Sequence, residues 1–265
     1  MTYPILNYFF LEILFITVFA INTIIDFQTK GDGLQDIRHE NYYSAQLIVA
    51  ALNEEHGIGP TLMEFLDNYH FPKIIVVDGH SVDKTVEIAK NLGADIAFQE
   101  GFGKGNAIAK AIQHIDLSVK YVVLTDADFT YPAEYVPEMI SLLEENPKVG
   151  MVCGNRFGRG MEPRALRGSF YFGNKLLALA HSLFNGVSLR DPLTGLRVIR
   201  TKILRDWSMR SQGFDVEVEL NRHVERKGYS ILELPIKYRK RIGEKKLKMK
   251  HGVTIMKRIL LEATY

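Results

Sequence analysis

The chain has little of what several common classes of protein require. It contains one cysteine in 265 residues, Cys153, which excludes an intrachain disulfide framework and a cysteine-rich zinc site. The apolar neighbours of Cys153 indicate a buried core residue. Lysine and arginine number 33 against 31 acidic residues, and this near balance does not indicate a nucleic-acid binder. The chain also has no internal repeat and no low-complexity tract.

One long hydrophobic run is present, at residues 3–27, and its length suits a single transmembrane helix. Glu12 within it would cost about 2.5 to 3.5 kcal/mol at the centre of a bilayer. No basic residue precedes the run, which disfavours a secretory signal peptide. Lys30 and Arg38 follow it and would place the next domain in the cytoplasm. We therefore expect a hydrophobic N-terminal helix over residues 1–27 that anchors the chain; the alternative is an amphipathic helix packed on the globular domain or lying in the membrane interface.

After a polar linker at residues 28–44, apolar runs of strand length alternate with helical patterns. This alternation predicts a parallel sheet covered on both faces by helices. An apolar content of 46% and a charged content of 24% are ordinary for such a globular domain. The expected strands here are 47–51, 73–78, 94–98, 121–126 and 149–154, and the expected helices are 54–69, 84–92, 105–115 and 133–145.

The second half of the chain is less regular. Helical patterns cover residues 166–184 and 215–227, and short strands are expected at 198–199 and 231–234.

The C-terminal part changes character. Residues 237–250 hold eight Lys or Arg against one Glu, and residues 252–262 follow as an amphipathic helix. We expect a core domain over residues 45–240 and a basic, amphipathic segment over residues 241–265. Such a segment suits an anionic membrane surface, and it lacks the aromatic residues of a nucleic-acid stacking platform.

A pair of aspartates, Asp126 and Asp128, follows the expected strand at 121–126. Open α/β sheets bind ligands at the carboxyl edge of their strands. Alternate residues of an extended chain point the same way, so the two carboxylates would share a face and repel each other unless a cation lies between them. Mg²⁺ and Mn²⁺ prefer such oxygen ligands and commonly bridge to a substrate phosphate. The alternative is a solvated acidic turn.

Polar residues also follow the first two strands. Asn53 and Glu54 come after the first, and Asp78 ends the second. Fold geometry alone would bring these groups close to the aspartate pair. Asn53 or Glu54 could instead only cap a helix, as could Ser81 or Asp83 after the second strand, and capping is compatible with a functional role.

A glycine-rich loop at residues 101–106 opens a helix, and a helix N-terminus favours anions. Its sequence matches neither a Walker A loop nor the Gly-x-Gly-x-x-Gly of dinucleotide enzymes. Lys104 in this loop could contact a nucleotide or be a solvated lysine.

Taken in order, these motifs resemble the family 2 glycosyltransferases of GT-A fold, and most closely the polyprenyl-phosphate glycosyltransferases such as dolichyl-phosphate mannose synthase. The resemblance covers about residues 45–250. It rests on Asn-Glu-Glu at 53–55, Val-Val-Asp-Gly-x-Ser-x-Asp-x-Thr at 76–85, Gly-x-Gly-Lys-Gly at 101–105, Asp-Ala-Asp at 126–128, Gly-Asn-Arg-Phe at 154–157 and Asp-Pro-x-Thr-Gly-x-Arg at 191–197. It implies a mixed, mainly parallel sheet flanked by helices.

The resemblance also implies roles for single residues. Asp128 would bind Mg²⁺ or Mn²⁺ directly, with Asp126 near the ribose or the sugar. Thr130 stands where the family commonly has a glutamine. The residues implied to line the nucleobase and ribose pocket are Ala51, Asn53, Glu54 and Asp78. The basic residues implied to hold phosphates or close the site are Arg156, Arg167 (or Arg164), Arg197 and Arg239 (or Arg241).

The implied reaction is an inverting, metal-dependent transfer of a hexose from GDP-mannose or a UDP-hexose to a polyprenyl (dolichyl) phosphate at the cytoplasmic face of a membrane. A lipid phosphate is already anionic and would need no catalytic base. A sugar hydroxyl acceptor would need one, and Asp215 is then the candidate, unless it only favours the start of its helix. A sugar nucleotidyltransferase and a non-catalytic sugar-nucleotide-binding module are further alternatives.

Overall fold

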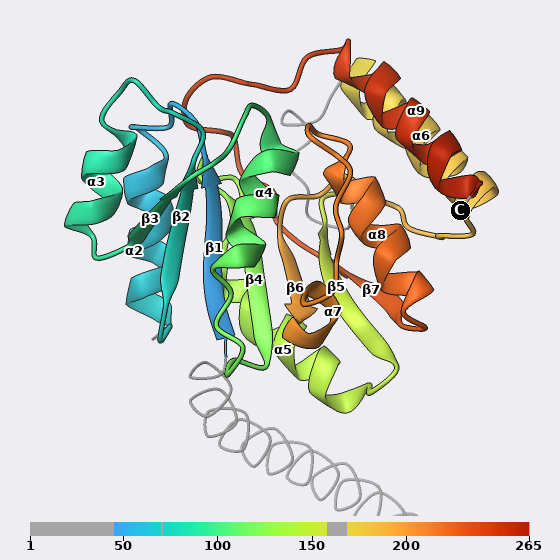
Figure 1. Ribbon diagram of the computed structural model, residues 1–265, viewed down its shortest axis with the longest axis horizontal. Coiled ribbons are helices and arrows are strands. Elements are labelled where there is room, and N and C mark those ends of the chain that lie inside the picture. Colours follow the sequence, from blue (N-terminus) through green and yellow to red (C-terminus); the bar gives the residue numbers. More distant parts are fainter. Residues whose placement is uncertain (1–44, 70, 158–168, 265) are drawn as a thin grey trace, which may run out of the picture. The chain divides into compact units, whose positions relative to one another are not determined.

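The computed structural model describes residues 45–69, 71–157 and 169–264 of the chain (Figure 1). The predicted N-terminal helix, the predicted linker and Arg167 lie outside these residues. No helix within the described ranges has the length and apolar character needed to cross a membrane. The N-terminal anchor and the domain boundaries therefore stay predictions.

The described residues form seven strands and eight α-helices, with one short 3-10 helix. The strands are β1 (Ala45–Ala51), β2 (Ile74–Asp78), β3 (Asp95–Phe98), β4 (Tyr121–Asp126), β5 (Val149–Asn155), β6 (Arg197–Arg200) and β7 (Ser230–Pro235). The helices are α2 (Ile58–Asn68), α3 (Thr85–Asn91), α4 (Lys104–Gln113), η1 (Ala133–Tyr135), α5 (Val136–Glu145), α6 (Ser169–Asn185), α7 (Thr201–Leu204), α8 (Val216–Arg226) and α9 (His251–Ala263).

All seven strands belong to one sheet, in the order β3-β2-β1-β4-β6-β5-β7. β1 pairs in parallel with β2 and β4, β2 with β3, and β5 with β7. Only β6 runs antiparallel to its neighbours, β4 and β5. The mixed, mainly parallel sheet flanked by helices is therefore confirmed.

Helices cover the sheet on both faces because its central strands are apolar on both sides. Along β1, Leu47 and Val49 belong to the core that packs against α2 and α5, whereas Ile48 belongs to the core that packs against α4 and α8. Side chains of a strand alternate between faces, so a continuous apolar run supplies both cores at once.

The C-terminal helix α9 packs beside α6, as Figure 1 shows, and also contacts α8. His181 of α6 in turn lies 3.4 Å from Asn221 of α8. Leu177 of α6, Ile255 of α9 and Val218 of α8 share a small apolar core. The fully buried Glu262 adds an ion pair of 2.8 Å to Arg226 of α8. The predicted amphipathic helix at residues 252–262 is thus present and packs against the sheet domain.

Strand register places the predicted site. Ala51 at the end of β1 lies opposite Asp78 at the end of β2, and Ala50 lies opposite Asp126 at the end of β4. The carboxyl ends of these three parallel strands therefore share one edge of the sheet.

Candidate active site

A cavity of about 570 Å³ lies at this carboxyl edge. The ends of β1 and β4, the start of α4 and the segment that follows β7 all contribute to its wall. Four carboxylates and seven basic side chains line it, and this excess of positive charge suits an anionic ligand. They are Glu54, Asp126, Asp128 and Glu217, with Lys104, Arg156, Arg239, Lys240, Arg241, Lys245 and Lys246.

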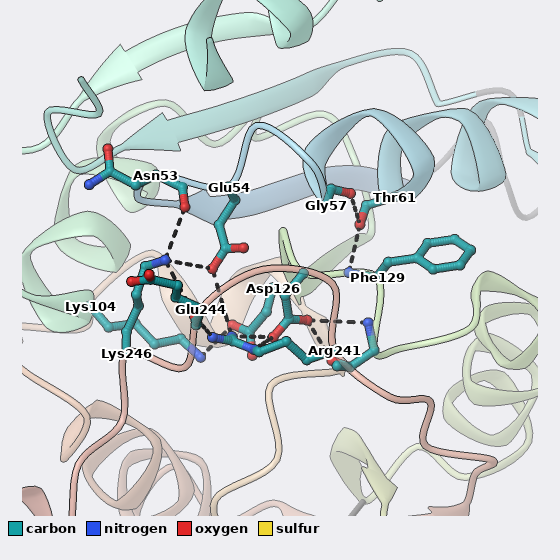
Figure 2. A network of polar contacts seen from close by, with 12 residues as sticks. Asn53, Glu54, Gly57, Thr61, Lys104, Asp126, Phe129, Arg241, Glu244 and Lys246 are labelled. Atoms are coloured by element: carbon teal, nitrogen blue, oxygen red, sulfur yellow. Dashed lines mark hydrogen bonds and ion pairs between the residues drawn. The ribbon is translucent and has the colours of Figure 1, made fainter. Parts of the chain in front are cut away.

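The Asp-Ala-Asp turn is held against the start of α2. A Cβ atom at Gly57 would lie 2.5 Å from the carbonyl oxygen of Ala127, so only glycine allows this approach. The hydroxyl of Thr61 donates to the Gly57 carbonyl at 2.9 Å and accepts from the N–H of Phe129 at 3.0 Å (Figure 2). These contacts fix the turn that carries both aspartates.

Asp128, the predicted metal ligand, is 2% exposed and uses both of its carboxylate oxygens. Its Oδ1 accepts hydrogen bonds from the N–H of Thr130 at 3.2 Å and from the Thr130 hydroxyl at 2.6 Å. Its Oδ2 accepts from Nε of Arg241 at 2.9 Å, and from Nη2 of the same guanidinium. Thr130 therefore orients Asp128, and Arg241 neutralises it.

Asp126 shares a cation with a second carboxylate. Nζ of Lys104 lies 2.7 Å from Oδ1 of Asp126 and 2.8 Å from Oε1 of Glu217. Burial alone would lower the pKa of Lys104, but the two carboxylates raise it above its usual value. Burial alone would likewise raise the pKa of Asp126, but Lys104 lowers it. Both of these contacts of Lys104 are to protein carboxylates, so its predicted contact with a nucleotide stays a prediction.

Glu54 faces two cations from the segment after β7 (Figure 2). Its carboxylate lies 3.7 Å from Arg241 and 3.5 Å from Lys246. Burial raises the pKa of Glu54 to about 7, and the two cations offset only part of this effect. Its Oε2 has no hydrogen-bond partner among the described residues.

The aspartate pair fits a divalent cation that is bound together with an anionic substrate. The described residues hold no cluster of three His, Cys, Asp or Glu side chains that could bind a metal unaided. Asp126 and Asp128 line the cavity and offer carboxylate oxygens, which suit Mg²⁺ or Mn²⁺ when phosphate and water supply the remaining ligands. Arg241 would have to release an oxygen of Asp128 first.

Arg156 lines the cavity and is held by Asp191. Its Nε and Nη2 each donate to the Asp191 carboxylate at 2.7 Å, which is the bidentate geometry of a strong pair. The guanidinium also lies over the ring of Tyr238, 5.4 Å from its centroid. Asp191 itself accepts a hydrogen bond from the Arg156 N–H. Arg156 thus has a fixed place on the cavity wall.

Arg197, which the resemblance placed among the residues that hold phosphates or close the site, is bound by groups within the protein. It is 1% exposed, and it is absent from the lining of the 570 Å³ cavity. Its guanidinium donates to Asn221 at 2.6 Å and to the carbonyls of Pro192 and Thr194 at 2.8 and 3.0 Å. These contacts hold the segment from Asp191 to Arg197 in shape, and a direct contact of Arg197 with substrate stays a prediction.

Asp215 precedes the first residue of α8 and is 4% exposed. Its Oδ2 accepts from Nε of Arg258 at 3.0 Å, and its Oδ1 accepts from the N–H of Gly213. The cavity lining includes its neighbour Phe214 and also Glu217. Asp215 therefore ties α9 to α8, and its role as a base stays a prediction.

The residues predicted for nucleotide binding divide into two groups. Ala51 and Arg239 line the cavity, as does Glu54. Asp78 is fully buried and accepts from the N–H of Ser81 at 2.8 Å, so it shapes the loop after β2.

Asn53 also acts within the protein. Its Oδ1 accepts from the N–H of Val82, and its carbonyl accepts from Lys246 at 2.9 Å. Arg239 in turn pairs with Glu64. The nucleotide contacts of these residues stay predictions.

Sequence reasoning missed Glu217 and Lys246. Glu217 lies two residues after Asp215, and only the rotation of α8 decides which of the two acids faces the cavity. Lys246 is one of eight basic residues in a segment without periodicity. The sequence shows the cluster of eight basic residues, but it does not show which of them reaches the cavity.

A model of the family "Glycosyl transferase family 2" matches residues 46–207. The chain belongs to glycosyltransferase family 2. The resemblance of its motifs is thereby confirmed, and the protein is a glycosyltransferase.

Two curated relatives of this family 2 glycosyltransferase come from Haloferax volcanii. The chain is 36% identical over 207 residues to a dolichyl-phosphate hexose transferase, a match that covers 76% of this chain and 85% of the relative. It is 30% identical over 192 residues to glycosyltransferase AglJ, a match that covers 72% of this chain and 62% of the relative. The chain thus spans less than two thirds of the length of AglJ.

Among solved structures, the family 2 glycosyltransferase is similar to glucosyl-3-phosphoglycerate synthase from Mycobacterium tuberculosis in complex with Mn²⁺, UDP and phosphoglyceric acid. The TM-score is 0.69 at 18% identity, over 87% of this chain and 82% of the other. A further structure of the same synthase holds Mg²⁺ and UDP. This likeness confirms the GT-A fold.

Proposed function

We propose that this glycosyltransferase transfers a hexose from a nucleoside diphosphate sugar, with Mg²⁺ or Mn²⁺, to a polyprenyl phosphate at the surface of a membrane. The observation that carries the proposal is the position of the cavity. It combines an aspartate pair with seven basic side chains, and part of its wall comes from α6 and α9, two helices that carry exposed apolar side chains on another side. An anionic head group with an apolar tail matches both features.

The donor side of the proposal rests on Asp126 and Asp128. Asp128 would hold the divalent cation, which would neutralise the charge of the diphosphate leaving group. Asp126, paired with Lys104, would lie nearer the ribose or the sugar. The Asp128 partner Arg241 would then be released and become able to contact phosphate.

The acceptor side rests on the basic wall of the cavity. A phosphate acceptor is anionic at neutral pH, so it attacks the anomeric carbon from the face opposite the diphosphate without a catalytic base, and the configuration inverts. Arg156, Lys240 and Lys245 line the cavity where such a phosphate would bind. Asp215, the candidate base for a hydroxyl acceptor, is bound to Arg258, and this favours the phosphate acceptor.

The membrane side rests on what we call the α6–α9 face. Its large apolar side chains are between 46% and 74% exposed: Phe172, Leu176, Leu179 and Leu183 on α6, with Val253 and Leu260 on α9. The α6 residues are spaced by three or four positions, so they form one stripe. Two exposed lysines belong to the same part of the chain as α9. Lys250 directly precedes this helix, and Lys257 lies on it between Val253 and Leu260.

Helices that lie in a membrane interface carry an exposed apolar stripe together with exposed basic residues, and α6 and α9 between them supply both. The same two helices contribute to the cavity wall through Asn174 of α6 and Ile255 of α9, which lie on the sides of the helices opposite the exposed residues. In this proposal, a lipid phosphate enters the cavity past these helices while its chain remains in the bilayer. The predicted N-terminal anchor and the cytoplasmic orientation complete this proposal.

One relative supports the proposed acceptor, and one solved structure supports the proposed donor. The name of the Haloferax volcanii dolichyl-phosphate hexose transferase states a hexose and a lipid phosphate for that protein. The mycobacterial synthase has been solved with Mn²⁺ and UDP-glucose. We extend a nucleotide hexose donor and a divalent cation to this chain as part of the proposal.

A donor screen tests it. The full-length protein in membranes is incubated with dolichyl phosphate, Mg²⁺ or Mn²⁺, and radiolabelled UDP-glucose, UDP-galactose or GDP-mannose. We expect label from one donor in the organic phase, and none when dolichol replaces dolichyl phosphate. Label transferred to glycans but never to lipid would contradict the proposed lipid phosphate acceptor. Hexose transfer that persists with excess EDTA would contradict the proposed metal dependence.

A further inference from the structure

Glu233 is an acid on the edge strand β7, and it is absent from the lining of the 570 Å³ cavity. Its Oε2 accepts a hydrogen bond from the backbone N–H of Arg190 at 2.8 Å, and its Oε1 accepts one from the backbone N–H of Asp191 at 2.7 Å. These N–H groups precede Glu233 by 43 and 42 positions. Hydrogen bonds to a charged carboxylate are short and strong, so this pair fastens a distant segment to the sheet.

That segment connects α6 to β6 and contains no helix or strand. It therefore has no ladder of backbone hydrogen bonds of its own, and side chains from elsewhere bind its polar groups. Arg197 donates to two of its carbonyls, and the hydroxyl of Tyr131 accepts from the N–H of Gly195 at 2.7 Å. Glu233 binds the part that contains Asp191, so β7 sets where the Asp191 backbone lies.

Asp191 in turn fixes the side chain of Arg156. It is fully buried, and its carboxylate accepts from Nε, from Nη2 and from the backbone N–H of Arg156. The two side-chain contacts occupy one edge of the guanidinium and leave three of its five N–H groups for other partners. Since Arg156 lines the cavity, the orientation that it presents to an anionic ligand there is set by Asp191.

Arg156 differs from the other basic residues of the lining in what holds it. Lys104 is bound by two carboxylates, and the remaining five belong to the segment between β7 and α9, which contains no helix or strand. Arg156 directly follows β5, which pairs with both β6 and β7. A binding group that is held by a sheet and by a fixed partner is preorganised for its ligand.

We propose that Glu233 is a positioning residue for the acceptor phosphate. By holding the backbone of Asp191 it sets the orientation of Arg156, and Arg156 contacts the phosphate. This inference rests on the proposed function, which supplies the acceptor. Loss of the Glu233 carboxylate would leave two N–H groups without their acceptors and free Asp191 to shift, and a small displacement of a binding group lowers affinity.

Glu225 provides a matched control. Burial raises the pKa of Glu225 and of Glu233 alike, so both are partly buried acids. Glu225 lies in the last turn of α8, away from the cavity, and its ion pair with Arg222 is long, at 4.0 Å. Glu225→Gln therefore removes a comparable charge without touching Asp191 or Arg156.

The first test measures the KM of each substrate with the full-length protein. In Glu233→Gln an amide nitrogen replaces one accepting oxygen, and we expect the KM for dolichyl phosphate to rise about tenfold. The KM for the nucleotide sugar and the affinity for UDP (or GDP) should change by less than about twofold, because the donor side of the cavity is untouched. Glu225→Gln should leave both KM values unchanged. A rise of both KM values together in Glu233→Gln would indicate general distortion and overturn the positioning role.

The second test asks whether Glu233 acts through Arg156. Arg156→Gln should raise the KM for dolichyl phosphate by about tenfold or more, and adding Glu233→Gln to it should raise that KM by less than about a further twofold. Two factors that multiply would overturn the route through Arg156. Where Arg156→Gln transfers too slowly, the dissociation constant of geranyl phosphate in the presence of Mn²⁺ and UDP gives the same comparison.

If Glu233→Gln does not fold, Glu233→Asp keeps the charge and shortens its reach by one methylene, and the same selective rise is expected. An acceptor KM within about twofold of the wild type in the Glu233 variant would overturn its positioning role alone. Absence of transfer to dolichyl phosphate by the wild type from every donor would instead overturn the proposed function.

Discussion

Arg241 and Asp128 are 113 positions apart in sequence, yet Nε of Arg241 donates to Oδ2 of Asp128 at 2.9 Å. The guanidinium therefore binds an oxygen that the proposed metal requires. Both residues line the same cavity, so the two cations compete for one carboxylate. In the absence of donor, this competition should weaken metal binding.

Removing the competing guanidinium should tighten metal binding. For Arg241→Gln without donor, we expect Mn²⁺ to bind about tenfold more tightly, which corresponds to about 1.4 kcal/mol. Free Mn²⁺ measured by electron paramagnetic resonance gives the affinity. Arg239→Gln is the matched control, because Arg239 pairs with Glu64 and not with the aspartates. An unchanged Mn²⁺ affinity in Arg241→Gln would contradict this competition.

Removing the carboxylate itself should abolish metal-dependent transfer. In Asp128→Asn the remaining amide oxygen can still accept from Thr130, so the fold should survive. We expect kcat to fall by about 100-fold or more because the leaving diphosphate loses its cation. Asp206→Asn changes an exposed aspartate and should leave kcat unchanged. A threefold loss or less in Asp128→Asn would refute the assignment of this ligand.

Close approach at Gly57 should make this position intolerant of any side chain. In Gly57→Ala, the new Cβ would meet the Ala127 carbonyl at 2.5 Å, so the aspartate turn must shift. We expect the free energy of unfolding to fall by about 1 to 3 kcal/mol and the activity to fall with it. Gly173→Ala on α6 meets nothing within 4 Å and should stabilise its helix slightly. Urea denaturation compares the two, and equal stabilities would count against a tight contact at Gly57.

Titration of Glu54 should make stability depend on pH. Burial raises its pKa from 4.5 to about 7 in the folded protein, so the folded state binds more protons than the unfolded state between these values. The contribution of Glu54 to stability is therefore greatest below about pH 4.5 and is lost as the pH rises through about 7.

The variant Glu54→Gln removes this titration. Without ligands, we expect its Tm to exceed that of the wild type at pH 8 and the difference to shrink toward pH 5. Glu64→Gln, at a residue paired with Arg239, controls for general loss of an acid. A Tm difference that is constant from pH 5 to pH 8 would exclude a raised pKa at Glu54.

Charge on the α6–α9 face should weaken membrane binding. Leu176 and Leu183 are 60% and 72% exposed, so Leu176→Glu/Leu183→Glu should not disturb the core. We expect sedimentation with vesicles of phosphatidylglycerol and phosphatidylcholine to fall by about tenfold. Leu117→Glu, at a 58% exposed leucine after α4, should bind as the wild type does. Equal binding by all three proteins would remove this face from the proposal.

Local sequence was sufficient for the elements and for the chemistry at the strand ends. The apolar runs that became β1, β2 and β4 are recognisable by their residues alone, and each is followed by polar groups. Parallel strands in one sheet bring such ends to a common edge, so Asp126, Glu54 and Asp78 could be placed together from the sequence.

Tertiary structure decided which of these side chains pair. Lys104 binds Asp126 and Glu217, and Arg241 binds Asp128, whereas Arg197 turns inward to Asn221. Such pairings depend on the rotation of α8 and on the path of the segment after β7. A few residues of local pattern do not specify either, because long-range packing sets both. The sequence alone therefore determined the fold and the family, and the packing of distant segments determined which charged side chains of the site pair with one another.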